Sequence, residues 1–288
     1  MLNRRQVIQL GFSSASVAAT IPDAIGATVS GEQIIDTNAN LSQWPFRRLP
    51  LDQVDKLVNK YRSLGITQAW VSSFDGLLHR DITSVNERLA ARAKMFDELI
   101  PVGVINLRLP DWANDLQRCC KHHHMPGIRL YPSYHNYGLD DPVMLELLHR
   151  AAENRCFVQI VVALEDVRTQ HQRFRAEDVD LRPLPDALSR VEGVAVQLLN
   201  ARIDADRLND WKTLDRLYFD TARVDSTDGV PKLVEQVHAE RVMLGTHAPF
   251  LIPEAALIRT YESGQLDDAS LRAVLAGNAN QLIAELAL

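Results

Sequence analysis

The residues of this chain that could do chemistry stand directly at or after the ends of short apolar runs. Asn38 and Asn40 end the first such run, and Asn200, Asp220 and His247 close or follow three later ones. Side chains two residues apart on a strand point the same way, so we expect the amides of Asn38 and Asn40 to face one side. An aspartate beside a histidine can hold the imidazole as a general base. We predict that His247 and Asp220 are catalytic and that the three asparagines bind substrate. A helix cap or a structural hydrogen bond is the alternative for Asp220.

Further polar residues stand at or after the fourth, fifth and seventh runs. They are Arg129, Tyr134, His135, Arg168, His171 and Arg223. A guanidinium can bind a carboxylate or a phosphate through two parallel hydrogen bonds, so we predict substrate binding by these residues. A surface ion pair is the alternative for each arginine, and loop packing is the alternative for Tyr134 and His135.

These residues need a fold that brings the ends of separate runs together. Eight runs of β type alternate with helical segments, at 33–37, 67–72, 99–105, 127–130, 157–162, 194–199, 217–220 and 241–244. Runs such as "FVQIVV" and "VAVQLL", each interrupted by one Gln, suit strands that are covered on both faces. The alternation predicts an α/β protein with a parallel sheet, and the length from residue 31 to 288 matches a single closed (β/α)8 barrel of the TIM type. An open doubly wound sheet is the alternative, although no Gly-x-Gly-x-x-Gly follows the first run.

The barrel prediction places one further segment at the functional end of the barrel and another at the opposite end. Chemistry in such a barrel gathers where the strands end, so the long irregular stretch 165–183 is a candidate lid or mouth loop. The segment "CCKHHHM" at 119–125 looks like a metal cluster, but it precedes a strand and therefore lies at the face that serves stability. We expect Cys119, Cys120 and Cys156 to be reduced, because adjacent cysteines bridge only with strain.

Four segments are similar to sequence motifs of one protein family. "IIDTNANL" is similar to a first-strand "IDTHxHL", "PGIRLYPSYHNYGLDDP" to a fourth-strand segment, "VMLGTHAPF" to an eighth-strand "ILFGSDxPF", and "GNANQLI" to a closing "GNAxRLL". From residue 31 to the C-terminus the chain thus resembles, in register, the amidohydrolase-related family (amidohydrolase 2 type) of the metal-dependent hydrolase superfamily. The resemblance implies a barrel fold and a hydrolase or decarboxylase activity.

The resemblance fails at the metal ligands. It places two histidines of the family at Asn38 and Asn40, two more near Val161 and at Asn200, and the family's aspartate at His247. A carboxamide is a poor ligand for zinc-like ions, so we expect a degenerate metal site and no metal cofactor. The less favoured alternative is a divalent, zinc-like metal at a relocated site formed by Asp220, His247, His135, His171 and Glu165.

The first 27 residues differ from the rest of the chain. Arg4 and Arg5 precede a mildly apolar stretch at 7–21 and then small residues, as in a twin-arginine export signal. We predict export to the periplasm, with a cytoplasmic location if the leader does not function and a loose N-terminal helix as the alternative structure. The formal net charge of -6 shows no attraction for nucleic acid, and no run of about 18 apolar residues indicates a membrane span. The oligomeric state stays open, a homo-oligomer included.

Three functions follow from these residues. The first is a hydrolase or lyase without a metal that acts on a small carboxylated or cyclic metabolite as its small-molecule ligand. The second is a catalytically inactive ligand-binding or structural homologue of such enzymes, and the third is a hydrolase with a relocated metal site. We favour the first narrowly, because the strand ends keep titratable residues that could transfer protons.

Overall fold

The computed structural model describes residues 32–202, 211, 214–261 and 264–287, so the predicted leader lies outside the described residues. Its strands are β1 (Ile35–Leu41), β2 (Gln68–Ser73), β3 (Leu99–Pro101), β4 (Gly103–Val104), β5 (Gly127–Leu130), β6 (Phe157–Val161), β7 (Val196–Leu199), β8 (Leu217–Asp220) and β9 (Val242–Met243). Paired strands are parallel, and each lies beside the next in sequence within the runs β1 to β3 and β4 to β9. β3 and β4 form one strand interrupted at Val102, whose N–H donates to the Val71 carbonyl at 2.8 Å.

The sheet closes on itself between β1 and the chain after β9. The Thr37 N–H donates to the Leu244 carbonyl at 2.8 Å, and the His247 N–H donates to the Asn38 carbonyl at 2.8 Å. Ala39 and Ala248 form a parallel bridge beside them. The predicted single (β/α)8 barrel is therefore confirmed, with the described strands at the positions of the eight predicted runs.

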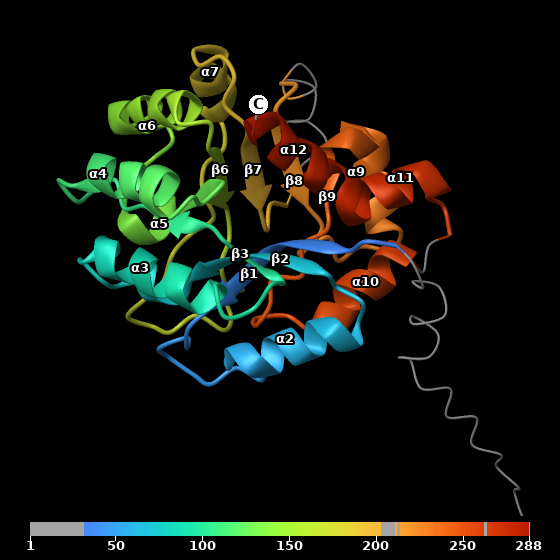
Figure 1. Ribbon diagram of the computed structural model, residues 1–288. Coiled ribbons are helices and arrows are strands. Elements are labelled where there is room, and N and C mark those ends of the chain that lie inside the picture. The colour runs from blue at the N-terminus through green and yellow to red at the C-terminus, as the bar shows by residue number, and fades with distance from the viewer. Residues whose placement is uncertain (1–31, 203–210, 212–213, 262–263, 288) are drawn as a thin grey trace, which may run out of the picture.

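Helices alternate with the strands and surround them (Figure 1). They are α2 (Val54–Ser63), α3 (Ile82–Ala93), α4 (Trp112–Gln117), α5 (Pro132–His135), α6 (Pro142–Glu153), α7 (Leu184–Ser189), α9 (Gly229–Val237), α10 (Pro253–Tyr261), α11 (Asp268–Arg272) and α12 (Asn278–Ala287), with the 3-10 turns η1 (Phe74–Leu77) and η3 (Ala239–Arg241) and the π-helical turns η2 (Arg118–His122) and η4 (Ala273–Gly277). α6 begins as its sequence dictates: Asp141 accepts a hydrogen bond from the Val143 N–H, and Pro142 occupies the first turn, where no N–H is needed.

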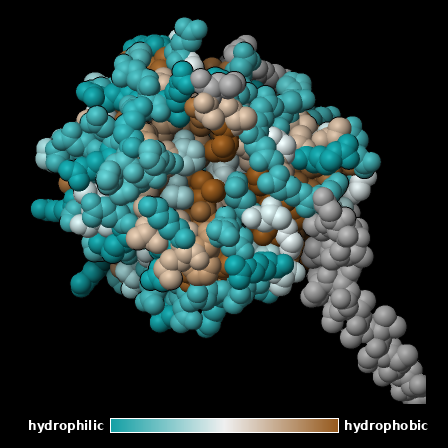
Figure 2. All heavy atoms as spheres, in the orientation of Figure 1, coloured by the Kyte–Doolittle hydropathy of each residue, from teal (hydrophilic) through white to brown (hydrophobic). Residues whose placement is uncertain are grey.

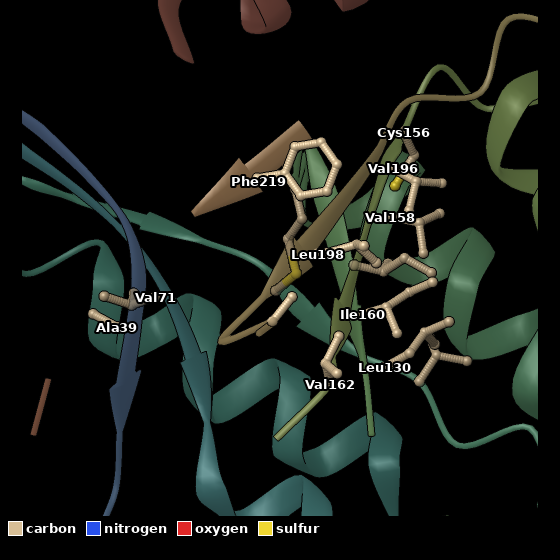
Figure 3. Packing of buried hydrophobic residues seen from close by; sticks show 14 of the residues in the cluster. Ala39, Val71, Leu130, Cys156, Val158, Ile160, Val162, Val196, Leu198 and Phe219 are labelled. Carbon is tan, nitrogen blue, oxygen red and sulfur yellow. The ribbon is translucent and has the colours of Figure 1, made fainter. Parts of the chain in front are cut away.

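Three apolar clusters fill the molecule at different levels. The largest lies between strands and helices, where Val158, Ile160, Val196, Leu198 and Phe219 pack together (Figure 3). A second closes the end where the strands begin, against α12. A third, which includes Trp44, Phe74 and Tyr131, lies where the strands end. The face seen in Figure 2 is mainly hydrophilic, with apolar residues in the hollows. Among the described helices none has the length and apolar character to cross a membrane.

The first strand is longer than predicted. It extends to Leu41, so Asn38 and Asn40 lie within the strand and not at its end. Its register against β2 shifts between Asp36 and Ala39, which marks a bulge. A bulge breaks the strict alternation of faces, so the consecutive side chains of Thr37 and Asn38 both face the barrel interior. Thr37 bonds to Gln197, and Asn38 bonds to Asn200. Pairing with β2 up to Leu41 and closure against the chain after β9 extend the strand, and neither partner is visible in a local sequence pattern.

Candidate active site

Asn38 belongs to a hydrogen-bonded group with a buried acid. Its Nδ2 donates to Asn200 Oδ1 at 2.9 Å and to Asp220 Oδ2 at 2.6 Å. The second oxygen of Asp220 accepts from the Asn200 N–H at 2.9 Å. Burial raises the pKa of Asp220 from 3.8 to about 6, although the hydrogen bonds from Asn38 and Asn200 act in the opposite direction. We call Asn38, Asn200 and Asp220 the acid half of the barrel interior.

Asn40 belongs to a second group with a buried cation. Arg129 is 0 % exposed, and its Nη1 donates to Asn40 Oδ1 at 3.0 Å and to the Ala39 carbonyl at 2.9 Å. Tyr131 also donates its hydroxyl to Asn40 Oδ1, at 3.0 Å. Burial lowers the pKa of Arg129, against the opposing effect of Tyr131. Its Nη2 has no hydrogen-bond partner among the described residues. We call Arg129, Asn40 and Tyr131 the cation half.

A layer of amides supports the cation half from below. Arg129 Nε donates to Gln159 Oε1 at 2.8 Å, and Gln159 Nε2 donates to Gln197 Oε1 at 2.8 Å. Gln197 in turn donates to Thr37 Oγ1 at 2.7 Å. The sequence interpretation missed both glutamines as site residues. The available signal was the single Gln that interrupts each of two otherwise apolar strands, since a fully buried amide needs polar partners inside the barrel.

His247 has a different partner from the one predicted. Its Nε2 lies 2.7 Å from the Leu164 carbonyl, and because a carbonyl only accepts, Nε2 carries the proton and Nδ1 is left as an acceptor. Nδ1 has no partner among the described residues. Burial lowers the pKa of His247 to about 3, so the ring stays neutral. Asp220 instead accepts hydrogen bonds from Asn38 and Asn200. Asn38 links the two residues that were predicted to pair, because its side chain donates to Asp220 and its carbonyl accepts from the His247 N–H.

A further buried carboxylate positions these residues. Asp36 is 0 % exposed and accepts from the Tyr61 hydroxyl at 2.5 Å, from Thr246 Oγ1 at 2.5 Å and from the Thr246 N–H at 2.9 Å. It also accepts from the Asn38 N–H at 3.0 Å. Asp36 therefore fixes α2 and the chain before His247 to β1, a role the sequence interpretation did not assign.

Aromatic side chains cover both halves. Trp44, 2 % exposed, contacts Phe46, Phe74, Phe174 and Phe250 with ring centroids 5.1–6.2 Å apart. These five residues, which we call the aromatic cap, come from the loops after β1, β2, β6 and β9. The cap belongs to the same cluster as Tyr131, and Phe250 stacks on His247 at 5.2 Å. The interior polar residues are therefore sealed from solvent.

An ion pair fastens the cap. Arg47 Nη1 donates to Glu165 Oε1, and its guanidinium lies 5.5 Å from the Phe250 ring centroid. Glu165 starts the segment 165–183, which runs beside the loop after β1 in Figure 1. Burial raises the pKa of Glu165, while Arg47 acts to lower it. The segment thus lies where a lid was predicted.

The remaining predicted residues do not all reach the interior. The side chain of Arg168 is 85 % exposed and pairs with Asp166, two residues before it, so it lies in solvent and not in the interior. His171 is also exposed and stacks on Phe46 at 4.8 Å, outside the sealed interior. Arg223 is partly buried and lines a separate hollow of about 420 Å³ with Ala201.

Tyr134 and His135 lie beside the cap. His135 Nε2 is 3.1 Å from the Gly76 carbonyl, and burial lowers its pKa to about 4. The Tyr134 ring contacts Phe174 at 5.0 Å. Its buried hydroxyl has no partner among the described residues, and burial raises its pKa. Both residues pack beside the cap loops.

A metal ion does not fit the residues of this interior. Asn38 presents its NH2 group, not its oxygen, to Asp220, and the guanidinium of Arg129 occupies the space beside Asn40. A fixed cation and inward N–H groups both repel a dication. Glu165 is held by Arg47 and His135 by a carbonyl, and among the described residues no three His, Cys, Asp or Glu side chains converge as ligands.

Solved structures of known proteins share this fold. 5-Carboxyvanillate decarboxylase from Sphingomonas paucimobilis has 12 % identity and a TM-score of 0.72 over 88 % of this chain and 99 % of its own. A dihydroxybenzoic acid decarboxylase from a Polaromonas species, solved with manganese and 2-nitroresorcinol, has 12 % identity and a TM-score of 0.68 over 88 % and 97 %. A Staphylococcus aureus protein assigned as an amidohydrolase has 11 % identity and a TM-score of 0.68 over 88 % and 99 %.

Sequence comparison alone gives no such match. No family model and no curated protein matches this chain. At 11–12 % identity the structural likeness establishes the fold. The chain shares its barrel fold with these proteins, which include one assigned as an amidohydrolase.

Proposed function

We propose that this protein is a metal-independent hydrolase or lyase that acts on a small carboxylated, cyclic compound inside the barrel. The observation that carries the proposal is the fully buried guanidinium of Arg129, whose Nη2 has no hydrogen-bond partner in the part of the chain that the structure describes. Burying a cation with a free donor is unfavourable unless a ligand supplies the acceptor. A carboxylate matches a guanidinium in charge and in geometry.

Neighbouring atoms extend the same ligand site. Asn200 Nδ2 is a second buried donor without a partner among the described residues, and His247 Nδ1 is a buried acceptor. A compound with one carboxylate and one hydroxyl could use all three atoms. The decarboxylases with the same fold are named for ring compounds of this kind, which supports the choice of substrate class.

Asp220 is the proposed proton-transfer residue. Its pKa of about 6 lies close to neutral pH, so both the acid and the carboxylate are populated in ordinary conditions. His247, with a pKa of about 3, stays neutral and orients the substrate through Nδ1. This assignment divides the roles that the sequence gave jointly to the two residues.

Access requires the aromatic cap to move. Asn40, Asn200, Asp220 and His247 are at most 3 % exposed, and Arg129 is 0 % exposed. Opening the segment 165–183 would break the Arg47–Glu165 pair and withdraw Phe174 from Trp44. We propose this segment as the lid of the site.

The test is turnover of small hydroxybenzoates by untagged protein treated with EDTA, followed by chromatography of the products. We expect activity to survive the chelator. Asp220→Asn should lower kcat by at least about 100-fold, as for loss of a general acid or base. Arg129→Lys, which keeps the charge but loses the planar donor pair, should raise KM about tenfold. Arg168→Met, at the exposed ion pair, is the matched control and should change neither constant.

Activity that EDTA abolishes and manganese or zinc restores would contradict the metal-independent reaction. Unchanged kcat in Asp220→Asn, in protein that melts like the wild type, would remove Asp220 from the chemistry.

A ligand-binding homologue without turnover is the second candidate. It is favoured by the acid half, in which both oxygens of Asp220 already accept hydrogen bonds. Calorimetric binding of a hydroxybenzoate that is lost in Arg129→Lys, with no product after long incubation, would select this function over the enzyme.

The cell compartment belongs to the same proposal. We propose that the leader exports the folded chain to the periplasm. Replacing both Arg4 and Arg5 by Lys should retain the protein in the cytoplasm, as measured by cell fractionation. Periplasmic recovery of that variant would contradict a twin-arginine route.

A further inference from the structure

The cysteine–histidine segment 119–125 remains outside the site described above. It lies where the strands begin, in the turn η2 that continues α4 and leads into β5. His122 and His123 contact each other edge to face at 4.9 Å, and no metal-binding group of described residues includes them. The groups of this segment that could react are therefore its thiols.

The backbone brings two of these thiols together from distant parts of the chain. Gly127 at the start of β5 is in register with Phe157 at the start of β6, and the Phe157 N–H donates to the Pro126 carbonyl at 3.1 Å. The Met125 N–H donates to the Cys119 carbonyl at 2.9 Å, which folds η2 back toward the same point. Cys120 in η2 packs against the apolar cluster that contains Cys156, directly before β6, and the two thiols interact with each other. The Cys156 thiol itself donates to the Phe157 carbonyl at 3.6 Å.

The two thiols are chemically unequal. Cys156 is 2 % exposed, whereas Cys120 is partly exposed. The neighbouring Cys156 thiol, aided by the charge of Lys121, lowers the pKa of Cys120. The interaction with Cys120, together with burial, raises the pKa of Cys156. A reachable sulfur with thiolate character beside a protonated partner is the arrangement of an attacking and a resolving cysteine.

We propose that Cys120 and Cys156 form a redox pair that a hydroperoxide converts reversibly into a disulfide. The Cys120 thiolate attacks the peroxide oxygen, the O–O bond breaks, and Cys120 becomes a sulfenic acid. The Cys156 sulfur then attacks the Cys120 sulfur, so the S–O bond breaks and the S–S bond forms. With hydrogen peroxide, two thiols and one peroxide give one disulfide and two waters. The disulfide would join η2 to the start of β6.

Cys119 provides a control within the same segment. It is 0 % exposed, and its sulfur packs over Gly103, where a Cβ would approach it to 2.4 Å. Burial raises its pKa well above the ordinary value. It adjoins Cys120 in sequence but is buried and protonated, so it should resist oxidation.

The experiment oxidises the purified full-length chain with hydrogen peroxide, alkylates the remaining thiols and maps the peptides by mass spectrometry. We expect wild type and Cys119→Ser to lose the mass of two hydrogen atoms and to contain a Cys120–Cys156 peptide pair that dithiothreitol separates. Cys156→Ser should stop at a Cys120 sulfenic acid that dimedone traps. Cys120→Ser should keep both remaining thiols reactive to alkylation after unfolding.

Mapping of the wild type decides the matter even if a variant does not fold. A disulfide that includes Cys119, a Cys120 that proceeds to sulfinic acid with Cys156 still a thiol, or three unmodified thiols would each overturn the proposal.

Discussion

The acid half and the cation half of the barrel interior each contain an asparagine of β1, and the two asparagines present opposite ends of the amide group to their charged partners. Asn38 turns its NH2 group toward the carboxylate of Asp220, whereas Asn40 turns its oxygen toward the guanidinium of Arg129. The acid half has both carboxylate oxygens occupied, while the cation half keeps Nη2 unpartnered among the described residues. A pair of amides two residues apart can thus hold opposite charges in a sealed interior.

In the proposed function the two halves have separate tasks. Arg129 Nη2, which has no partner among the described residues, suits a bound anion, whereas the pKa of about 6 of Asp220 suits proton transfer. The two charges also act on each other, since Asp36 and Asp220 both oppose the lowering of the pKa of Arg129 by burial. Changes in either half should therefore have effects that the other half does not share.

The largest effect should follow removal of the buried cation. Arg129→Met leaves Gln159 Oε1, the Ala39 carbonyl and part of Asn40 without donors and leaves two acids without a nearby counter-charge. We expect a loss of about 3–5 kcal/mol in the free energy of unfolding, measured by urea titration. Arg168→Met should unfold like the wild type. Equal midpoints for both variants would show that the cation half has no special role.

The acid half should appear as a pH dependence. Between pH 4 and 6 the folded chain keeps a proton on Asp220 that the unfolded chain releases, so stability falls as pH rises through this window. A shift from 3.8 to about 6 corresponds to about 3 kcal/mol. His247 has a lowered pKa and acts in the opposite direction, so the informative quantity is the difference between wild type and Asp220→Asn. A difference that is flat from pH 4 to 7 would refute the raised pKa.

A smaller effect should follow loss of the support beneath both halves. Tyr61→Phe removes one donor from Asp36 and leaves the apolar ring in place. Because hydrogen bonds to charged groups contribute more than neutral ones, we expect a loss of about 2 kcal/mol in thermal or urea unfolding. Tyr137→Phe, whose buried hydroxyl has no partner among the described residues, is the matched control. A larger loss in Tyr137→Phe than in Tyr61→Phe would contradict the role of Asp36.

The smallest effect on stability should come from the cap. Arg47 is 39 % exposed in its side chain, so Arg47→Met should cost about 1 kcal/mol or less. Loosening the lid should nevertheless increase quenching of Trp44 fluorescence by acrylamide, measured in a variant whose other tryptophans are replaced by Phe. Unchanged quenching would mean that the Arg47–Glu165 pair does not fasten the cap.

The sequence predicted what local patterns determine. Apolar runs located each strand, and the alternation with helices located the carboxyl ends where Asp220 and His247 lie. Local patterns do not show pairing between distant segments. The extension of β1 to Leu41 and the bond between Asp36 and Thr246 were therefore not predicted. Arg168 shows a second limit of local patterns. Its position after a strand suggested that it lies in the site, but its guanidinium forms an ion pair with the nearby Asp166.

The aromatic cap was missed for a related reason. Trp44, Phe74 and Phe250 are separated widely in sequence and become one cluster only when the loops of the barrel meet. Single aromatic residues in loops carry no local period that would predict their contact.

The central claim is that Arg129 and the amides replace a metal ion in this barrel, and elemental analysis of the untagged protein tests it most directly. The protein should be produced with zinc, manganese and iron supplied and then dialysed without chelator. We expect metal contents far below one equivalent per chain in protein that is folded and active. One tightly bound equivalent of any of these metals, lost in Asp220→Asn, would contradict it.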